Sequence, residues 1–122
     1  MSKKRRVAET WGRAAESIAA LYLLAKGYRI LGHRLRTPFG EVDLAAWKGG
    51  VLVIVEVKAR KSIAAALEAV GREQQQRILR AAQVLAGRWR LNHAPIRLDI
   101  IVIGAQLWPH HVRNAWGLDT PH

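Results

Sequence analysis

The sequence predicts an α/β domain whose elements run in the order helix, three strands, helix and strand. Segments 8–26 and 65–90 repeat apolar residues at steps of three and four, which is typical of one face of a helix. Segments 51–59 and 96–104 are rich in β-branched residues, which favour strands. A glycine pair at 49–50 joins the first of these strands to an apolar run before it, which indicates a β-hairpin.

The first helix is predicted to begin at Ala8 and to end before Gly27, because glycine commonly stops a helix. A strand at 28–36 follows, with Gly32 as the position for a bulge. The Pro and Gly residues of segment 37–40 then predict a turn into the hairpin. The face of the first helix that packs on the sheet is expected to carry Trp11, Ala15, Ile18, Tyr22 and Ala25.

The second helical region, 65–90, fits one helix or two helices divided at Gly71. Strand 96–104 completes the core of the sheet. Segment 107–116 adds an edge strand, a place that tolerates Pro109 because an edge leaves a backbone donor free.

The chain is strongly basic, with 20 Lys and Arg residues against nine Asp and Glu residues and a net charge of +11. Such a field favours polyanionic partners, with nucleic acid ahead of an anionic membrane surface. The absence of cysteine excludes disulfides and thiolate metal sites. No apolar run approaches the ~20 residues that cross a bilayer, so no membrane segment is expected.

Residues 1–7, which include the run KKRR, are expected to form a flexible basic arm, and residues 8–122 a single domain. The basic start has no apolar core of a secretion signal behind it. We therefore expect a cytoplasmic protein.

Strand 51–59 is apolar on both faces, with Leu52 and Ile54 on one side and valines on the other. It is therefore expected at the centre of the sheet, covered on each side. Glu56 and Lys58 share the face of Leu52 and Ile54, so two charged groups continue an otherwise apolar row.

The turn at 49–50 determines which side chains face each other across the hairpin. With a two-residue turn, Asp43 stands opposite Glu56 and Glu41 stands opposite Lys58. A four-residue turn would offset the two carboxylates diagonally, and a three-residue turn would place them on opposite faces.

Two half-buried carboxylates with Cβ atoms ~4.5–5.5 Å apart repel each other unless they share a proton or a cation. A divalent cation is favoured, because Mg²⁺ binds one or two carboxylates, water and phosphate oxygens. Lys58 is then placed to orient or deprotonate a water molecule and to offset charge on a phosphorus centre. The alternative is a strand that emerges into solvent, with ordinary salt bridges such as Glu41 to Lys58.

The segment GEVDL at 40–44, followed by VEVKAR at 55–60, resembles the PD-(D/E)xK nucleases, the restriction-endonuclease-like superfamily. More closely, the chain resembles the YraN-like (UPF0102) family of predicted endonucleases, related to archaeal Holliday junction resolvases. The likeness extends from WGRAAESIAALYLLAKGYRIL to RLDIIVI and RNAW. It implies a mixed β-sheet flanked by helices with an α-β-β-β-α-β core, which matches the element order above.

The resemblance also implies a Mg²⁺ site, with Mn²⁺ as a substitute. Asp43, Glu56 and the carbonyl group of Val57 would be metal ligands, and Lys58 would be the catalytic lysine. Glu16 matches the acid of the family's first helix, which would reach the metal directly or through water. From spacing alone, Glu16 is equally well a solvent-facing helix residue.

The chain departs from the family pattern at three places. Ala15 stands where a second glycine usually precedes the helix acid, and Arg34 where an asparagine is frequent. A lysine common at the start of the second helix is replaced within REQQQR, where Gln74, Gln75 or Gln76 would take over its task. Residues near the site that are expected to contact DNA, unless they form only a solvated basic rim, are Arg34, Arg36, Arg60, Lys61 and Gln75.

Three further polar residues have structural interpretations that we favour. Asp99 fits the family pattern, but inside a β-branched strand it is expected to pair with Arg97 or a backbone donor. His110 and His111 are adjacent and point to opposite faces of a strand, so a surface position on the edge is favoured over a metal site.

The resulting hypothesis is a Mg²⁺-dependent endonuclease that acts on branched or single-stranded DNA with water as the nucleophile. The alternative is a non-catalytic nucleic-acid-binding module in a DNA repair or recombination complex. A basic adaptor for an acidic protein or a membrane is a weaker third hypothesis. Symmetric cutting of a branched junction needs two active sites, so a homodimer is expected, with the apolar edge near Leu107 and Trp108 as its interface.

Overall fold

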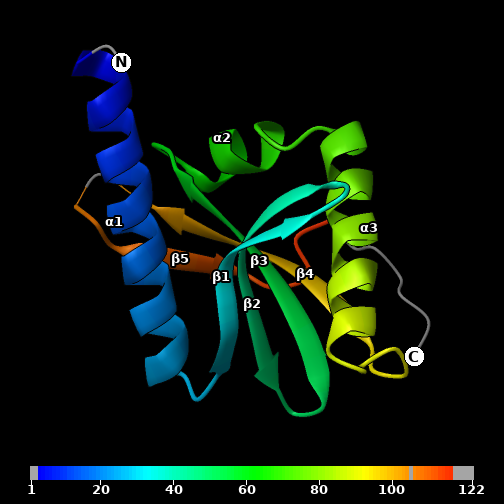
Figure 1. The fold of residues 1–122 in the computed structure, drawn as a ribbon. Coiled ribbons are helices and arrows are strands. Elements are labelled where there is room, and N and C mark those ends of the chain that lie inside the picture. The colour runs from blue at the N-terminus through cyan, green and yellow to red at the C-terminus, as the bar shows by residue number, and fades with distance from the viewer. Residues whose placement is uncertain (1–2, 105, 117–122) are drawn as a thin grey trace.

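In the structure, a computed structural model, residues 3–104 and 106–116 are described, with side chains from residue 12 onward. The elements follow the predicted order (Figure 1). The second helical region consists of two helices, and Gly71 is the N-cap of the second. The bounds are α1 Lys3–Ala25, β1 Arg29–Thr37, β2 Gly40–Lys48, β3 Val51–Ala59, α2 Ile63–Glu68, α3 Arg72–Arg88, β4 Ile96–Ile103 and β5 Pro109–Val112.

A five-stranded sheet in the order β1-β2-β3-β4-β5 lies between two helical layers. β3 and β4 are parallel and the other neighbours are antiparallel, so the sheet is mixed, as expected. α1 covers one face of the sheet, and α2 and α3 lie on the other (Figure 1). A parallel partner for β3 requires a crossover connection, which α2 and α3 supply.

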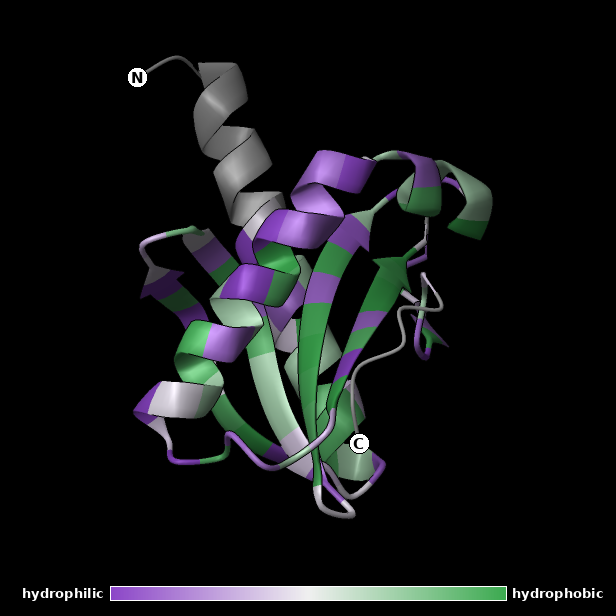
Figure 2. Ribbon diagram, turned by 90° about the vertical axis from the view of Figure 1, so that its right-hand side faces the viewer, coloured by the Kyte–Doolittle hydropathy of each residue, from purple (hydrophilic) through white to green (hydrophobic). Residues whose placement is uncertain are grey.

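β3 is covered on both faces, as its apolar pattern predicted. Leu52 and Ile54 belong to the hydrophobic cluster that contains Ile78 of α3, whereas Val53 belongs to the cluster that contains Leu23 of α1. The strands are largely hydrophobic, and the helices mix hydrophobic and hydrophilic residues (Figure 2). Among the described residues, no helix has both the length and the apolar character needed to cross a bilayer.

The buried face of α1 agrees with the prediction at Ala15, which is buried, and at Ile18 and Tyr22, which pack against the same core cluster. Ala15, Ala19 and Leu23 are buried, whereas Ala25, which was expected on the packed face, is exposed. The packed side extends beyond the predicted row to Ala19 and Leu23. The alanines let α1 approach the sheet closely. Trp11, also assigned to the packed face, lies outside the residues whose side chains are described.

α1 begins at Lys3, earlier than the predicted start at Ala8. Residues 3–7, which were expected in the basic arm, are therefore helical, while residues 1 and 2 lie outside the described residues. Lysine and arginine are good helix formers, and no glycine or proline interrupts this segment, so nothing in it stops the helix.

The hairpin between β2 and β3 has the predicted two-residue turn. Gly49 and Gly50 have φ values of 59° and 79°, which glycine adopts at little cost. The register that follows from this turn holds as far as the pair Leu44 and Val55. The bulge predicted at Gly32 is also present, as a register shift beside it on β1.

Candidate active site

β2 and β3 separate at the end of the hairpin farthest from its turn. Their last pair is Leu44 and Val55, and beyond it, in the described residues, β2 pairs with β1 and β3 pairs with β4. In Figure 1 the tip of the β1–β2 hairpin turns toward α3, while the end of β3 runs toward α2. We call this opening the fork; its first residues are Asp43 on β2 and Glu56 on β3.

Asp43 and Glu56 are connected through each other's main chain. The N–H group of Val57 donates to Oδ2 of Asp43 at 2.8 Å, and the N–H group of Asp43 donates to Oε2 of Glu56 at 3.4 Å. Carboxylate oxygens thus accept main-chain N–H groups beyond the last ladder pair of the two strands. Asp43 and Glu56 therefore meet, as predicted. They do not form the predicted ladder pair through their backbones.

Glu41 does not face Lys58 as predicted. Its ladder partner in the described residues is Arg36 on β1, and the ladder between β2 and β3 ends before Glu41. Within residues 12–104 and 106–116, the ion pairs include none with Glu41 or Lys58. The salt bridge that formed the alternative interpretation of this hairpin is therefore absent from the described part of the chain.

Burial makes both carboxylates of the fork hard to ionise. Glu56 is only 3% exposed, and burial, followed by the charge of Asp43, raises the pKa of Glu56 to about 7. Burial also raises the pKa of Asp43 despite the bond from Val57, and the charge of Glu16 adds to the rise. Neither acid has an ion-pair partner among the described residues. The charge of Lys58 opposes both shifts, so this cation lies near the two acids without pairing with them.

Glu16 of α1 lies at the edge of the fork, where it contacts Arg34. The distance from Nε of Arg34 to Oε1 of Glu16 is 2.8 Å. The described residues bring no three His, Asp or Glu side chains together in a position to hold one metal ion. The carboxylate pair is therefore Asp43 and Glu56, and Glu16 stands beside this pair in contact with Arg34, a residue expected to contact DNA.

Arg77 of α3 belongs to the site and was not identified from the sequence. Its Nη1 atom donates to the carbonyl oxygens of Phe39, at 3.2 Å, and Glu41, at 3.5 Å. Gly40, with φ of +115°, leaves room for it, since a Cβ atom there would meet the guanidinium group. Burial and Asp43 raise the pKa of Glu56, and the charge of Arg77 opposes them. Its bonds to the carbonyl groups of Phe39 and Glu41 distinguish Arg77 from the other arginines of α3. The sequence does not show these bonds.

The other residues expected to contact DNA are exposed or bonded elsewhere. Arg36, Arg60 and Lys61 are exposed, and the last two line a pocket of about 250 Å³ beyond the end of β3. Gln75 is half-buried, and its Nε2 atom donates to the carbonyl oxygen of Val70 at 3.0 Å. This bond ties Gln75 to the turn between α2 and α3.

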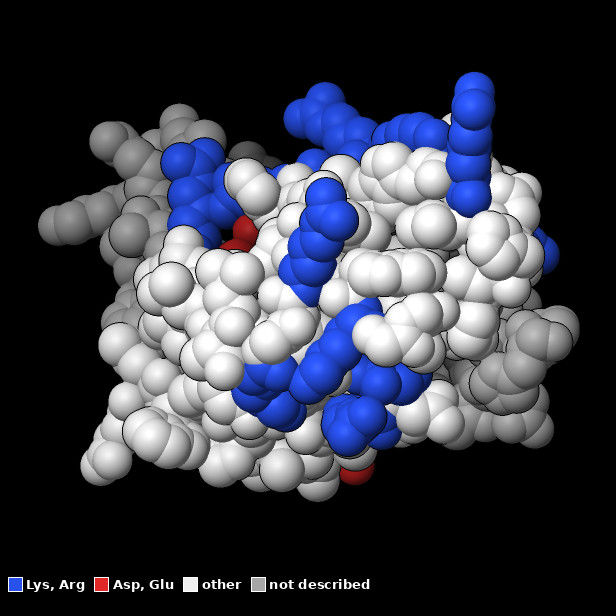
Figure 3. All heavy atoms as spheres, turned by 90° about the horizontal axis from the view of Figure 1, so that it is seen from below, with Lys and Arg blue, Asp and Glu red and all other residues white. Residues whose placement is uncertain are grey.

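Positive charge extends well beyond the fork. Figure 3 shows Lys and Arg side chains gathered over the end of the molecule that carries the β2–β3 turn, with few acids among them. This end lies away from the fork. The net charge of +11 therefore attracts polyanions to the molecule as a whole.

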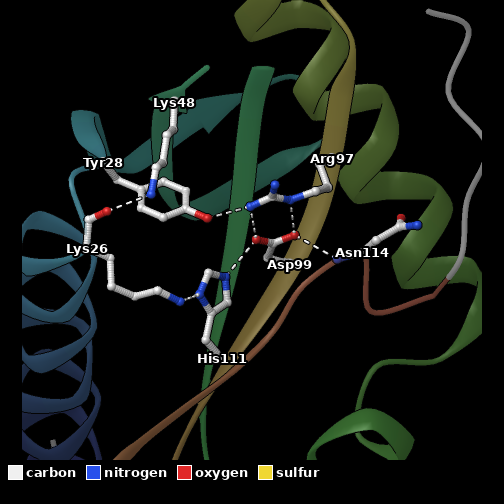
Figure 4. A network of polar contacts seen from close by, with 7 residues as sticks. All are labelled: Lys26, Tyr28, Lys48, Arg97, Asp99, His111 and Asn114. Carbon is white, nitrogen blue, oxygen red and sulfur yellow. Dashed lines mark hydrogen bonds and ion pairs between the residues drawn. The ribbon is translucent and has the colours of Figure 1, made fainter. Parts of the chain in front are cut away.

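Asp99 on β4 is a buried acid with a full set of partners (Figure 4). Arg97 donates to it from Nε at 2.9 Å and from Nη2 at 2.8 Å, and the N–H group of Asn114 donates at 2.9 Å. Nε2 of His111 lies 2.7 Å from its Oδ2 atom. Burial alone would raise the pKa of Asp99, but the bonds from His111, Arg97 and Asn114 hold it below its ordinary value. The predicted structural role of Asp99 is confirmed.

The surface position predicted for His111 is wrong. Its side chain is 1% exposed, its Nδ1 atom lies 2.9 Å from Nζ of Lys26, and the ring of Tyr28 packs against it edge-on at 5.8 Å. His110 is exposed, as expected for neighbours that point to opposite faces of a strand. β5 is an edge in its backbone pairing, but α1 lies against it, so the histidine on that side is buried.

The chain is similar to known proteins over most of its length. The sequence profile described as Uncharacterised protein family UPF0102 matches residues 15–103, a range that contains the fork. A UPF0102 protein of Caulobacter sp. strain K31 is 56% identical over 106 residues, which are 86% of this chain and 76% of the relative. UPF0102 proteins of Maricaulis maris and Agrobacterium fabrum are each 48% identical, over 95% and 94% of this chain and 92% and 95% of their own lengths.

Proposed function

This chain belongs to the uncharacterised protein family UPF0102, and we propose that it is a Mg²⁺-dependent endonuclease that hydrolyses phosphodiester bonds in branched or single-stranded DNA. The observation that carries the proposal is the fork. Asp43 and Glu56 share a desolvated position there, with no ion-pair partner among the described residues. Two such acids destabilise the fold unless a proton or a cation from solution joins them.

The donor set of the fork fits Mg²⁺, a hard cation that is usually held by one or two carboxylates, with water and phosphate oxygens as its other ligands. Asp43, Glu56 and the carbonyl group of Val57 would hold it, and Glu16 would reach it directly or through water. Mn²⁺ would suit the same oxygen donors. The bound ion would lower the pKa of a coordinated water molecule and offset charge on the phosphate.

Lys58 supplies a positive charge beside the two acids. It is half-buried, follows Glu56 by two positions on β3, and influences the pKa of both Asp43 and Glu56. In the proposed reaction its ammonium group orients the attacking water and offsets the charge that builds on the phosphorus centre. Water is the nucleophile, so no covalent intermediate with the protein forms.

DNA is the proposed substrate because the chain is strongly basic and exposes Arg36, Arg60 and Lys61, which suit phosphate contacts. We propose that the protein acts in the cytoplasm. For a junction cut on two strands we propose a homodimer, which would bring two forks to one substrate. Leu107 and Trp108, 43% and 69% exposed, would contribute to its interface.

The test is a cleavage assay with labelled four-way junction, flap, single-stranded and duplex DNA in Mg²⁺, Mn²⁺ or EDTA. We expect cutting of DNA with unpaired or branched segments, and only with metal. Asp43→Asn and Lys58→Ala should each lower the rate about a hundredfold or more. Glu68→Gln is the matched control, because Glu68 is an exposed acid of α2, and it should cut like the wild type.

The second candidate is a nucleic-acid-binding module that does not cut. The ion pair of Glu16 with Arg34 favours it, because this pair engages an acid that the metal would need. Tight binding by the wild type that declines steeply with salt, without cutting under either metal, would replace the endonuclease with this module.

A further inference from the structure

A pocket of about 330 Å³ lies beside the fork, between α1 and strands β1 and β2. Its buried or half-buried apolar lining consists of Ala20, Ile30 and Leu44. Its volume falls within the range of small-molecule sites. Glu16 lines this pocket and also acts on Asp43 in the fork, so the pocket and the fork share a wall. We call it the α1 pocket.

The exposed lining of the α1 pocket is polar and cationic: Arg13, Ser17 and His33. Neither the guanidinium group of Arg13 nor the ring of His33 has a hydrogen-bonding partner among the described residues. Flat guanidinium and imidazole groups stack on nucleobases, and hydroxyl and carboxylate groups bond to the edges of bases. A phosphate group alone would bind to the cationic side chains but would make no contact with the apolar lining.

We propose that the α1 pocket binds the base of an unpaired nucleotide next to the phosphodiester bond that is cut at the fork. The inference rests on the proposed function and specifies its substrate: DNA that is unpaired at the cleavage position. The apolar lining receives the base, and Arg13, His33 and Arg34 stack on it or attract the phosphates on either side.

The register of β1 and β2 places the α1 pocket next to the fork. His33 pairs with Leu44, so the next residues along the two strands, Arg34 and Asp43, are neighbours. Adjacent strands lie ~4.7–4.9 Å apart. A nucleotide held against His33 and Arg34 therefore has a phosphate within reach of Asp43.

A base inside a duplex does not reach such a pocket. It is stacked and paired, and proteins that enclose a base either take it from a single strand or turn it out of the helix. The pocket therefore favours flaps, loops and single strands over continuous duplex.

The decisive variant fills the α1 pocket. Ala20→Phe places a ring among its apolar residues, and Ala25→Phe is the matched control on an exposed position of the same helix. Fluorescence anisotropy in EDTA measures binding of a labelled single-stranded oligodeoxynucleotide and of the duplex of the same sequence. Ala20→Phe should weaken single-strand binding about tenfold or more and leave duplex binding within about twofold. The control should match the wild type on both.

A second variant keeps the test valid if Ala20→Phe does not fold. His33→Ala removes a stacking group from the exposed rim, and His93→Ala removes an exposed histidine from the loop before β4. His33→Ala should weaken single-strand binding about fivefold or more, and His93→Ala should not change it. Equal losses on single strand and duplex, or no loss on either, would overturn the inference.

Cleavage by the same proteins in Mg²⁺ or Mn²⁺ separates the two proposals. A wild type that binds single strands through the α1 pocket and cuts no DNA overturns the endonuclease and supports the pocket. A wild type that cuts single strands, with an equally active and folded Ala20→Phe variant, overturns the pocket and supports the endonuclease.

Discussion

Two buried acids on neighbouring strands differ in their partners. Glu56 of β3 is 3% exposed and Asp99 of β4 is 0% exposed. Asp99 accepts bonds from Arg97, His111 and a main-chain N–H group, and its pKa is lowered. Within the part of the chain that the structure describes, Glu56 accepts one bond, at 3.4 Å, from the N–H group of Asp43, and its pKa is raised to about 7.

Burial disfavours the ionised form of both acids, so the partners decide the outcome. The fold supplies charged and polar partners to Asp99, and this acid connects β4, β5 and the turn that follows α1 through its network (Figure 4). The fold supplies no ion-pair partner to Glu56 among the described residues. A buried acid left in this state is typical of a site for a ligand from outside the chain.

Loss of the carboxylate from Asp99 should have the largest effect on stability. Asp99→Asn leaves Arg97 and His111 beside a neutral amide, and removal of one partner from a buried ion pair costs about 3–5 kcal/mol. Urea unfolding at about pH 7 measures this loss. A loss below about 1 kcal/mol would contradict the stabilising role of the network.

Glu56→Gln should stabilise the metal-free protein at high pH. The folded-state pKa of about 7 lies above the ordinary 4.5, so the stability linked to the neutral acid is complete below pH 4.5 and is lost as the pH rises through 7. The shift corresponds to roughly 3 kcal/mol. Urea unfolding in EDTA should therefore give a variant more stable than the wild type at about pH 8 and similar to it at about pH 4.

The matched control for this pH dependence is Glu68→Gln, which changes an exposed acid of α2. Its stability should follow the wild type across the whole range. If the free energies of unfolding of Glu56→Gln and the wild type changed with pH in parallel, the folded-state pKa of Glu56 would be ordinary. The contrast with Asp99 would then disappear.

His111→Ala should have an intermediate effect. The variant removes the group that lies 2.7 Å from Oδ2 of Asp99 but leaves both bonds from Arg97, so the expected loss is about 1–3 kcal/mol. His110→Ala, at the exposed neighbouring position, should change the free energy of unfolding by less than about 0.5 kcal/mol. Equal losses in thermal or urea unfolding would show that the buried contact contributes nothing specific.

Glu16→Gln should have the smallest effect on stability. The side chains of Arg34 and Glu16 are 35% and 20% exposed, and an ion pair so open to water contributes less than about 1 kcal/mol. The variant should also lower the pKa of Asp43, because the charge of Glu16 adds to the rise that burial causes. NMR titration of the Asp43 carboxyl group measures this change, and an unaltered pKa would place Glu16 outside the site.

Much of the fold was predictable because its signals are local. The glycine pair at 49–50 determined the turn, and the turn determined the register through Leu44 and Val55. Period-2 and period-3.6 patterns identified the strands and helices, since burial repeats along each element. The exceptions lie at the ends of α1, where Ala25 is exposed and the helix begins at Lys3 instead of Ala8.

The candidate site was predictable in its membership and not in its geometry. Asp43 and Glu56 meet as expected, but their oxygens accept main-chain N–H groups beyond the last ladder pair, a bonding pattern that alternation does not encode. Arg77 and His111 were missed for a common reason: each acts through a partner distant in the sequence. Only the packing of α3 and α1 against the sheet reveals those partners.

The placement of the fork also has a consequence for the order of folding. Its two acids lie 13 residues apart in consecutive strands, whereas β4 joins β3 only after the crossover through α2 and α3. Local contacts form ahead of distant ones, so we expect the β1–β2–β3 meander to precede the docking of β4 and α3. Asp43 and Glu56 thus come together while water still surrounds them. Their desolvation belongs to the last step of folding, and an ionised Glu56 slows that step without slowing the hairpins.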